Sequence, residues 1–432
     1  KKTNYSTKFV SANPTGPLHL GHGRGGIIGD VLGNVLKFIG HDVTKEFYIN
    51  DAGNQMDKLG ISLKIRCQQA MGQDIELPEN SYQGEYLKNL AQECISKYGD
   101  GPLEKPDEFF KEYAKKQMLE MIKKTLSDYG IEYDVWFSEK DLHQSGSVDA
   151  ELKKLAKDGF TYEKDGAIWF KSTQFGDDKD RVLRRANGEV TYIAADVAYM
   201  EDKFKRGADH IIFVLGQDHH SYANRLQGIL QATGFGDKPL NVILYQLVAL
   251  KESGQSVKMS KRAGNIVSLR EIIDLVGQDV ARFFYLNRKA DTHLDFDIDL
   301  ALKKTDENPV FYIQYAYVRI KSILAKAALE KELHDISIKN AAGLGQSEQL
   351  LLKKIMILKE LLKNIGQNFQ THLLTYYLVE LAQLFHSYYN KNRVIDMDNI
   401  PLSRARILLL QQLKKTFELV SKLLEISTPE SM

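Results

Sequence analysis

Ser11-Ala-Asn-Pro-Thr-Gly-Pro-Leu-His-Leu-Gly-His-Gly-Arg24 is the stretch that decides the fold of this 432-residue chain. The apolar run from Phe9 to Ala12 predicts a buried strand, and the two prolines and the glycine that follow prevent this strand from continuing. After the turn, apolar residues recur at intervals of three and four up to Gly40, which predicts an amphipathic helix. The sequence therefore predicts a strand, a tight turn and a helix in succession.

His19, Gly21 and His22 are expected where the strand leads into the N-terminus of this helix. Backbone N–H groups at that position have no partner within the helix, and the positive end of the helix dipole favours an anion. A glycine lets a phosphate or an adenine ring approach the backbone, and two imidazoles add donors. A single loop histidine is usually only a surface residue, but this combination predicts an anion-binding site.

A second interpretation of the same stretch stays open. Gly21 to Gly26 also fits the dinucleotide-binding pattern G-x-G-x-x-G, and Glu46 lies at a suitable distance along the chain to bind a ribose hydroxyl. That pattern requires glycine directly after the strand, whereas Asn13 to Leu18 intervene here. The alternative function is a dinucleotide-binding oxidoreductase.

The stretch resembles the first signature of class I aminoacyl-tRNA synthetases, His-x-Gly-His, and its flanks most resemble the arginyl enzymes. Val257-Lys-Met-Ser-Lys-Arg-Ala-Gly264 resembles their second signature, because two lysines near glycines predict a mobile cationic loop that closes on phosphates. An oxidoreductase has no use for such a loop. The resemblance implies that the catalytic residues are His19, His22, Lys258 and Lys261, and that the ATP contacts are Gly21, Gly23, Asp218, Met259 and Ser260.

Tyr192 and Asp196 lie four residues apart, so they share one face if a helix begins there. A carboxylate accepts forked hydrogen bonds from a guanidinium, and a phenol adds orientation. The resemblance implies that this pair holds the arginine side chain. It also gives three further arginine contacts, Ser11, Asn13 and Gln217. One position departs from the family pattern, because Lys8 stands where a glutamate usually helps to bind arginine.

The length of the chain predicts two or three domains. We expect an α/β, Rossmann-like parallel-sheet catalytic domain over residues 1–268, with a helical insertion around 56–130. Residues 269–305 are expected to be connecting helices, and the resemblance implies that 306–432 form an all-α, helical-bundle anticodon-binding domain. Strands are predicted at Val43 to Ile49, Ile211 to Leu215 and Val242 to Val248, and none after Ser268. Helices are predicted at 269–276, 280–286, 347–366, 371–391 and 402–425.

Contacts with tRNA are predicted in both parts of the chain. The polar loop that contains Asn50 and Asp51 resembles a family signature near the substrate end of the tRNA, although it is equally ordinary turn chemistry. From residue 301 onward, 18 Lys and Arg outnumber 13 Asp and Glu, which suits a nucleic-acid surface but also a solvated bundle. Tyr312, Tyr315 and Arg393 are predicted to contact unpaired bases, although most tyrosines in such helices pack in a core.

The resemblance implies ATP with Mg²⁺, L-arginine and tRNA(Arg) as partners, and arginyl-tRNA as the product. No zinc is expected, because Cys67 and Cys94 alone cannot build a zinc site, and so few cysteines suit a reducing cytoplasm. We expect a cytoplasmic monomer without a membrane partner. The additional N-terminal domain that arginyl enzymes usually carry is expected to be missing. A non-catalytic tRNA-binding relative is the remaining alternative.

Overall fold

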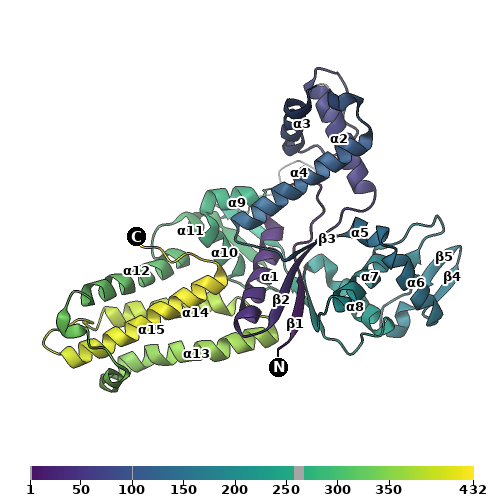
Figure 1. The fold of residues 1–432 in the computed structure, drawn as a ribbon. Helices are drawn as coiled ribbons and strands as arrows, with labels where there is room; N and C mark the ends of the chain where they lie inside the picture. The colour runs from purple at the N-terminus through teal and green to yellow at the C-terminus, as the bar shows by residue number, and fades with distance from the viewer. Residues whose placement is uncertain (1, 100, 257–266) are drawn as a thin grey trace. The chain divides into compact units, whose positions relative to one another are not determined.

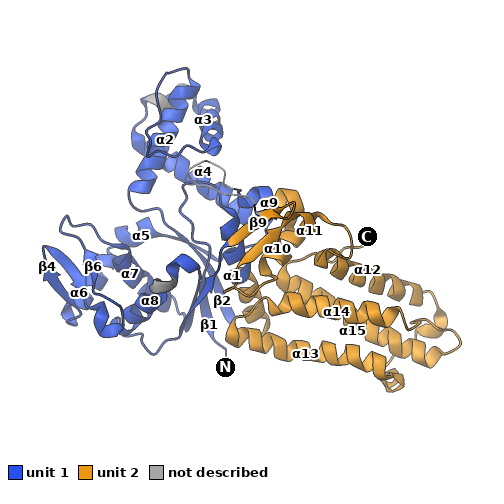
Figure 2. Cartoon of the chain, turned by 180° about the vertical axis from the view of Figure 1, so that it is seen from behind, with its two compact units in different colours: residues 1–29, 41–247, 258–271 blue, residues 30–40, 248–257, 272–432 orange. Residues whose placement is uncertain are grey.

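The computed structural model describes residues 2–99, 101–256 and 267–432 (Figure 1). The chain divides into two compact units, which are described separately below. Unit 1 contains residues 1–29, 41–247 and 258–271, and unit 2 contains residues 30–40, 248–257 and 272–432 (Figure 2). Each unit is therefore assembled from segments that are separated in the sequence.

Unit 1 is built on a parallel five-stranded sheet with the order β3-β2-β1-β7-β8. These strands are β1 (Asn4–Lys8), β2 (Asp42–Ile49), β3 (Val135–Ser138), β7 (His210–Gly216) and β8 (Leu240–Tyr245). The chain passes from β1 to β2 on one side and later returns to β7 on the other, so the strand order reverses between β1 and β7. Ligands of such sheets bind at this reversal, beyond the carboxyl ends of the strands. The predicted parallel α/β fold is confirmed.

Three helices connect or follow the central strands. These are α1 (Leu20–Phe38), α7 (Tyr192–Lys205) and α8 (His220–Ala232). The predicted helix after the proline-rich turn is thus confirmed as α1, and Gly40 follows its end with a φ of 100° that favours glycine. Apolar residues of α7 and α8 pack with those of β7 in one hydrophobic core. This core fixes α7 and α8 beside the carboxyl end of β7.

The predicted strand at Phe9 to Ala12 is wrong, because β1 ends at Lys8. Val10 and Ser11 have φ angles of 63° and 49°, so the backbone has already left the extended conformation. Phe9 is fully buried and packs against Gly29 of α1, where a Cβ atom would lie only 2.3 Å from the Phe9 ring. The apolar run therefore reports packing against the helix and not pairing in the sheet.

The helical periodicity predicted around residues 56–130 is confirmed by three helices, α2 (Asn54–Ala70), α3 (Glu85–Tyr98) and α4 (Asp107–Asp128). They share a small hydrophobic core of their own, in which both cysteines, Cys67 and Cys94, are buried as free thiols. Tyr86 of α3 donates a hydrogen bond to the carbonyl oxygen of Thr15 at 2.5 Å. This bond ties the inserted helices to the turn that precedes α1.

Residues 139–184 add two helices and a small antiparallel sheet to unit 1. The helices are α5 (Glu139–Gln144) and α6 (Ser147–Lys157), and the strands are β4 (Thr161–Lys164), β5 (Ala167–Phe170) and β6 (Arg181–Arg184). Asp165 and Gly166 join β4 to β5 with φ angles of 50° and 72°, as a tight hairpin turn requires.

Two predictions about strands near the middle of the chain are wrong. The strand predicted at Val242 to Val248 is divided, because β8 ends at Tyr245 and Val248 begins β9 (Val248–Glu252) in another sheet. A strand also follows Ser268, because β11 (Leu294–Asp297) pairs in parallel with β9. The same sheet contains β10 (Gln255–Ser256), which pairs with β9 on its other side. In β11 buried Leu294 and Phe296 alternate with two aspartates, but four residues are too few to show a period.

The remaining helices begin with α9 (Leu269–Val276), α10 (Gln278–Leu286) and α11 (Ile298–Leu302). The long helices of unit 2 are α12 (Pro309–Ala327), α13 (Gln346–Asn368), α14 (Leu373–Tyr389) and α15 (Ile400–Leu424). The last three confirm the helices predicted at 347–366, 371–391 and 402–425. Asn308 caps α12 by accepting a hydrogen bond from the backbone N–H of Val310 at 3.0 Å. Across the described part of the chain, we find no helix that combines the length and the apolar character needed to span a membrane.

Candidate functional site

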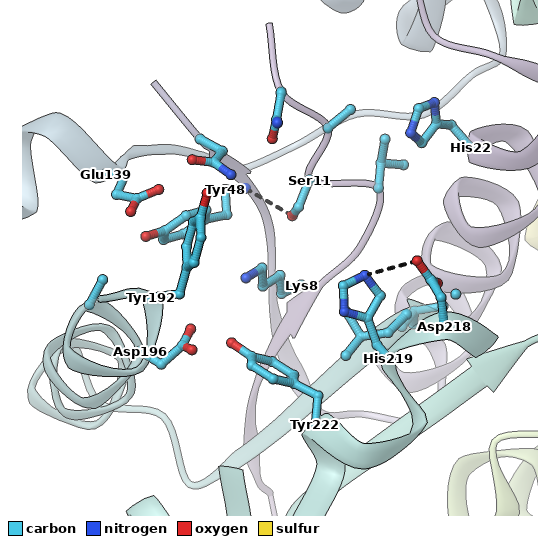
Figure 3. A pocket seen from close by; sticks show the side chains of 18 of the residues that line it. Lys8, Ser11, His22, Tyr48, Glu139, Tyr192, Asp196, Asp218, His219 and Tyr222 are labelled. Atoms are coloured by element: carbon cyan, nitrogen blue, oxygen red, sulfur yellow. Dashed lines mark hydrogen bonds and ion pairs between the residues drawn. The ribbon is translucent and has the colours of Figure 1, made fainter. Parts of the chain in front are cut away.

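A cavity of about 910 Å³ opens in unit 1 beyond the carboxyl ends of β1, β2 and β7 (Figure 3). Its walls come from the segment between β1 and α1, from the ends of β2 and β7, and from α7 and α8. Predicted site residues that line it are Ser11, Asn13, His19, His22, Asn50, Tyr192, Asp196 and Asp218. Segments that are far apart in the sequence therefore meet at the reversal point of the sheet.

His19 and His22 lie at the N-terminus of α1 with stacked rings, whose centroids are 3.7 Å apart. The backbone N–H of Gly21 donates to Nδ1 of His19 at 3.2 Å, and the backbone N–H of His19 donates to Nδ1 of His22 at 3.1 Å. A ring nitrogen that accepts a hydrogen bond carries no proton, so each neutral imidazole is protonated at Nε2. Each ring thus carries its proton on Nε2, and an Nε2–H group is the kind of donor that binds a phosphate oxygen.

The glycines at residues 21 to 26 lie within helix α1, not in a loop. Gly21 and Gly23 occupy its first turn, and a Cβ atom on Gly21 would lie 3.1 Å from the His19 ring. A Cβ atom on Gly25 would lie 2.5 Å from the ring of Tyr245, so close packing accounts for this residue. Glycine is therefore needed here partly for packing of the helix.

Glu46, which the dinucleotide interpretation assigned to a ribose, is fully buried. Its carboxylate is ion-paired with Lys203 at 2.5 Å and with Arg206 at 2.7 Å, and it accepts a hydrogen bond from the Tyr199 hydroxyl. A carboxylate with these partners has no room for a ribose hydroxyl. The geometry therefore argues against the dinucleotide-binding alternative.

Tyr192 and Asp196 lie one turn apart on α7, as predicted, and both line the cavity (Figure 3). Asp196 is only 8% exposed, and its Oδ2 has no hydrogen-bond partner in the part of the chain described. Burial raises the pKa of Asp196 to about 6, although Lys8 and Tyr222 act to lower it. A buried carboxylate oxygen of this kind suits a cationic ligand group.

Lys8, the residue that departs from the family pattern, ends β1 and points its ammonium group into the same cavity (Figure 3). Its Nζ atom lies 4.2 Å from the centre of the Tyr48 ring and 5.1 Å from that of Tyr199. Burial lowers the pKa of Lys8, and nearby carboxylates oppose this shift, Asp196 most strongly. Glu139, at the start of α5, is a second buried carboxylate in the cavity wall. The cavity thus contains both signs of charge.

Ser11 and Asn13 are held in place by hydrogen bonds within unit 1. Ser11 Oγ accepts a bond from the backbone N–H of Tyr48 at 3.2 Å, and Asn13 Nδ2 donates to Oε1 of Gln55 at 2.5 Å. The positive φ of Ser11 turns the chain toward the cavity at this point. Both side chains are therefore positioned by the turn and by neighbouring elements.

Asn50 and Asp51 follow β2 and differ in their surroundings. Asn50 lines the cavity, whereas Asp51 is buried. Asp51 Oδ1 accepts hydrogen bonds from Ser138 Oγ and from the backbone N–H of Lys140, each at 3.0 Å. These bonds give Asp51 a structural role at the start of α5, and the contact with tRNA remains a prediction for both residues.

Gln217 and Asp218 belong to the short 3-10 helix Gln217–His219, directly after β7. The Asp218 carboxylate lies 3.8 Å from Nε2 of His219 at the cavity wall. The second signature lies outside the described residues. Four predicted site residues belong to it, namely Lys258, Met259, Ser260 and Lys261.

Several lining residues were not predicted from the sequence, and Tyr48, Glu139 and Tyr222 are three of them. Tyr48 belongs to β2, Glu139 directly follows β3, and Tyr222 lies in the first turns of α8 after β7. These residues could have been sought at the carboxyl ends of the predicted strands, because such ends meet at one edge of a parallel sheet. This reasoning could not be applied to Glu139 because β3 has only four residues.

The tRNA contacts predicted near the C-terminus all lie in unit 2. Tyr312 and Tyr315 of α12 pack against the ring of His386, with centroid distances of 4.6 and 5.7 Å. Tyr315 is still 39% exposed, and the Arg319 guanidinium lies over its ring at 4.5 Å. Arg393 is exposed and lines a second cavity of about 740 Å³.

Residues 2–292 match the family described as tRNA synthetases class I (R), catalytic domain, and residues 313–432 match the DALR anticodon binding domain. The chain belongs to the class I tRNA synthetases of this family. An arginine–tRNA ligase from Geobacter sp. (strain M21) is 45% identical over 431 residues, which cover 98% of this chain and 78% of the relative. An arginine–tRNA ligase from Oceanobacillus iheyensis is 44% identical over 429 residues, covering 98% and 77%.

Solved structures agree with the assignment to the class I tRNA synthetases. A Campylobacter jejuni protein described as an arginyl tRNA synthetase superposes with a TM-score of 0.91 and 35% identity, covering 100% of this chain and 94% of that one. The arginyl-tRNA synthetase of Thermus thermophilus, at 20% identity, shares the fold with a TM-score of 0.78 and covers 100% of this chain and 83% of that one. The predicted architecture of a parallel-sheet catalytic domain followed by a helical C-terminal domain is confirmed, and the second domain matches the DALR anticodon binding domain.

Proposed function

We propose that the protein is an arginine–tRNA ligase, which converts ATP, L-arginine and tRNA(Arg) into arginyl-tRNA, AMP and pyrophosphate. The observation that carries this proposal is the buried, incompletely bonded carboxylate of Asp196, which lines the same cavity as two imidazole donors at a helix N-terminus. Curated relatives that match nearly the whole chain are named arginine–tRNA ligases, which supports the same conclusion.

In the first step, an oxygen of the arginine carboxylate bonds to the α-phosphorus of ATP, and the bond from that phosphorus to pyrophosphate breaks. Negative charge develops on the phosphate oxygens and on the departing pyrophosphate. His19 and His22 donate from Nε2 to these oxygens, while Lys258 and Lys261 accompany the leaving group. Catalysis consists of positioning and charge stabilisation, so no side-chain nucleophile is required. A tRNA hydroxyl then attacks the arginyl carbonyl and releases AMP.

The nucleotide lies over the N-terminus of α1 in this proposal. Gly21 and Gly23 allow its approach, and Asp218, Met259 and Ser260 complete the ATP contacts. ATP enters as its magnesium complex, in which the triphosphate oxygens hold the ion. Within residues 2–99, 101–256 and 267–432, we find no group of three His, Cys, Asp or Glu residues placed to hold a metal ion.

Arginine extends from the α-phosphate toward α7 in this arrangement. Asp196 binds the guanidinium, because a carboxylate accepts its forked N–H donors. Tyr192 adds orientation from the same face of the helix. The α-amino and α-carboxylate groups of arginine contact the remaining predicted residues, Ser11, Asn13 and Gln217.

Unit 2 contributes the surface that binds the anticodon part of the tRNA. Tyr315 and Arg393 are exposed on it, and the cavity next to Arg393 is also lined by the cations Lys326 and Lys391. Cations bind phosphates and exposed aromatic rings stack on unpaired bases. Tyr312 packs mainly against His386, so its contact is expected to be weaker. Asn50 and Asp51 are proposed to contact the substrate end of the tRNA, which is the end that receives arginine.

We also propose that the catalytic domain spans residues 1–268 and includes an insertion around 56–130. Residues 269–305 connect this domain to the anticodon-binding domain, which spans residues 306–432. The match of residues 313–432 to the DALR anticodon binding domain supports this division. We further propose a cytoplasmic monomer, and the two free buried thiols suit a reducing compartment.

The proposal is tested by exchange of labelled pyrophosphate into ATP with each amino acid in turn, with and without tRNA, followed by charging of tRNA(Arg). Arginine should support both reactions, and lysine should support them poorly because an ammonium lacks the planar fork of a guanidinium. Exchange with another amino acid and not with arginine would contradict the assignment. Binding of tRNA without exchange or charging would favour the non-catalytic relative.

A further inference from the structure

Two opposite charges are buried in the wall of the proposed arginine site without pairing. Lys8 is 9% exposed and Asp196 is 8% exposed, and both line the cavity. In the described chain we find no hydrogen bond or ion pair of Lys8 Nζ and no hydrogen-bond partner of Asp196 Oδ2. Burying a charge without a partner is unfavourable. The two groups are therefore expected to bond to a ligand that reaches both.

The ammonium group of Lys8 is held in place by aromatic rings. Its Nζ lies 4.2 Å from the centre of the Tyr48 ring, 5.1 Å from Tyr199 and 5.3 Å from Phe213. Such cation–π contacts stabilise an ammonium group in a desolvated position. Figure 3 shows Lys8 directed into the space that Tyr192, Asp196 and Tyr222 border.

The side chain of arginine satisfies only one of these two groups. A guanidinium has donors for Asp196, but it brings a second positive charge next to Lys8, and like charges repel strongly where little water is present. A ureido group has the same planar shape without the charge. Its N–H groups can donate to a carboxylate, and its carbonyl oxygen can accept a hydrogen bond from an ammonium group.

We propose that Lys8 is a specificity-determining residue of the arginine site, where its charge weakens binding of the guanidinium and narrows the preference for arginine over the neutral ureido isostere. This inference rests on the proposed function, because it assumes that the amino-acid side chain enters this cavity. Lys8 acts on the choice and affinity of the amino acid, whereas the phosphates are bound elsewhere in the cavity.

Lys8→Met tests the inference, because methionine keeps an unbranched apolar stem against the aromatic rings and removes the charge. Binding of L-arginine and of L-citrulline, the ureido isostere, is measured by calorimetry with a non-hydrolysable ATP analogue present. Arginine should bind Lys8→Met about tenfold more tightly or better, and citrulline should bind no better than to the wild type. The ratio of the two affinities should therefore rise by about tenfold or more.

A matched control is Lys140→Met, because Lys140 is the cation next to Glu139 in the chain but does not line the cavity. The Nζ atom of Lys140 pairs with Glu112 at 2.9 Å. The affinity ratio of Lys140→Met should equal that of the wild type. If Lys8→Met does not fold, Lys8→Gln is measured in the same way, with the same expected direction.

An unchanged or lower ratio in the folded Lys8 variant overturns this inference. Pyrophosphate exchange by the wild-type protein distinguishes failure of the proposed function from failure of the role proposed for Lys8. Exchange with arginine together with an unchanged ratio refutes the role of Lys8 alone. Absence of arginine-dependent exchange with tRNA present refutes the proposed function and this inference with it.

Discussion

Two buried lysines beside the same parallel sheet have opposite surroundings. Lys203 of α7 donates to Glu46 at 2.5 Å and to Ser6 Oγ at 2.9 Å, and Glu46 is paired with Arg206 as well. Lys8 of β1 faces a cavity and has no such partner in the described part of the chain. A buried charge that is ion-paired by the protein holds the fold together. One that faces a cavity keeps its bonding capacity for a ligand.

The carboxylates opposite these lysines differ in the same way. Burial alone raises the pKa of Glu46, but Lys203 and Arg206 lower it below its usual range. Burial raises the pKa of Asp196 to about 6, because the opposing effects of Lys8 and Tyr222 are smaller. The protein thus stabilises the charge of Glu46 by itself. Lys8 lies close enough to lower the pKa of Asp196 but forms no ion pair with it in the described part of the chain, and we propose that arginine supplies the paired cation.

The largest effect is expected at the paired site. Glu46→Gln keeps the shape of the side chain but leaves the buried Lys203, and the more exposed Arg206, without their common counter-charge. Breaking a buried pair in this way lowers the free energy of unfolding by about 3 to 5 kcal/mol. Urea unfolding at neutral pH measures the change. A loss under about 1 kcal/mol, the range of an exposed pair, would show that the network does not hold the sheet and α7 together.

Asp196→Asn should affect binding and not stability. Charge-assisted bonds to a guanidinium contribute about 1.5 to 3 kcal/mol each, so the affinity for arginine should fall about tenfold or more. The melting temperature should not fall, since the variant removes a buried charge that burial disfavours. Calorimetry and thermal unfolding measure the two quantities, and affinity for the ATP analogue serves as the control. A lower melting temperature with unchanged arginine affinity would make Asp196 a structural residue.

The pH dependence of arginine binding should follow the pKa of Asp196. The bound guanidinium favours the charged carboxylate, so binding is complete above about pH 6 and is lost as the pH falls through that value. The affinity should then decrease about tenfold for each further pH unit. The groups that face Asp196 are Lys8, Tyr222 and Glu139, and the first two lower its pKa. Asp196→Asn is the control and should lose this pH dependence. An arginine affinity of the wild type that does not change with pH would contradict the claim that Asp196 must be ionised to bind arginine.

The smallest effect is expected at the mouth of the site. Tyr192 is 67% exposed, so its hydroxyl exchanges a bond with water for a bond with the ligand. Such a bond contributes about 0.5 to 1.5 kcal/mol. Tyr192→Phe should therefore weaken arginine binding by about twofold to tenfold, as read from the same titration. A loss as large as that of Asp196→Asn would mean that the tyrosine is buried when arginine binds.

Features that depend on local sequence could be predicted. The turn before α1, the helix itself and the shared face of Tyr192 and Asp196 follow from proline, glycine and apolar spacing over short distances. The strand assigned to Phe9 to Ala12 failed because an apolar residue that packs on a helix looks the same in sequence as one in a sheet. The strand β11 was missed because its four residues are too few to show a period.

Features that depend on contacts between distant segments could not be predicted. Lys8 and Glu139 reach one cavity only because β1 and β3 belong to the same parallel sheet. Tyr222 can act on the pKa of Asp196 only because α7 and α8 pack together with β7 in one core. In the sequence, Lys203 and Lys8 are both lysines near apolar residues. Only the fold shows that one is paired and the other is not.

The most direct test of this account is the rise in melting temperature that saturating arginine produces in the wild type, in Asp196→Asn and in Glu46→Gln. A ligand that binds only the folded state at about a hundred times its Kd stabilises it by about 2.7 kcal/mol. We predict that arginine raises the melting temperature of the wild type and of the less stable Glu46→Gln, and that it raises the melting temperature of Asp196→Asn clearly less, because each tenfold loss of affinity removes about 1.4 kcal/mol of this stabilisation. A rise in Asp196→Asn equal to that of the wild type would contradict the claim that the unpaired buried carboxylate is the arginine site.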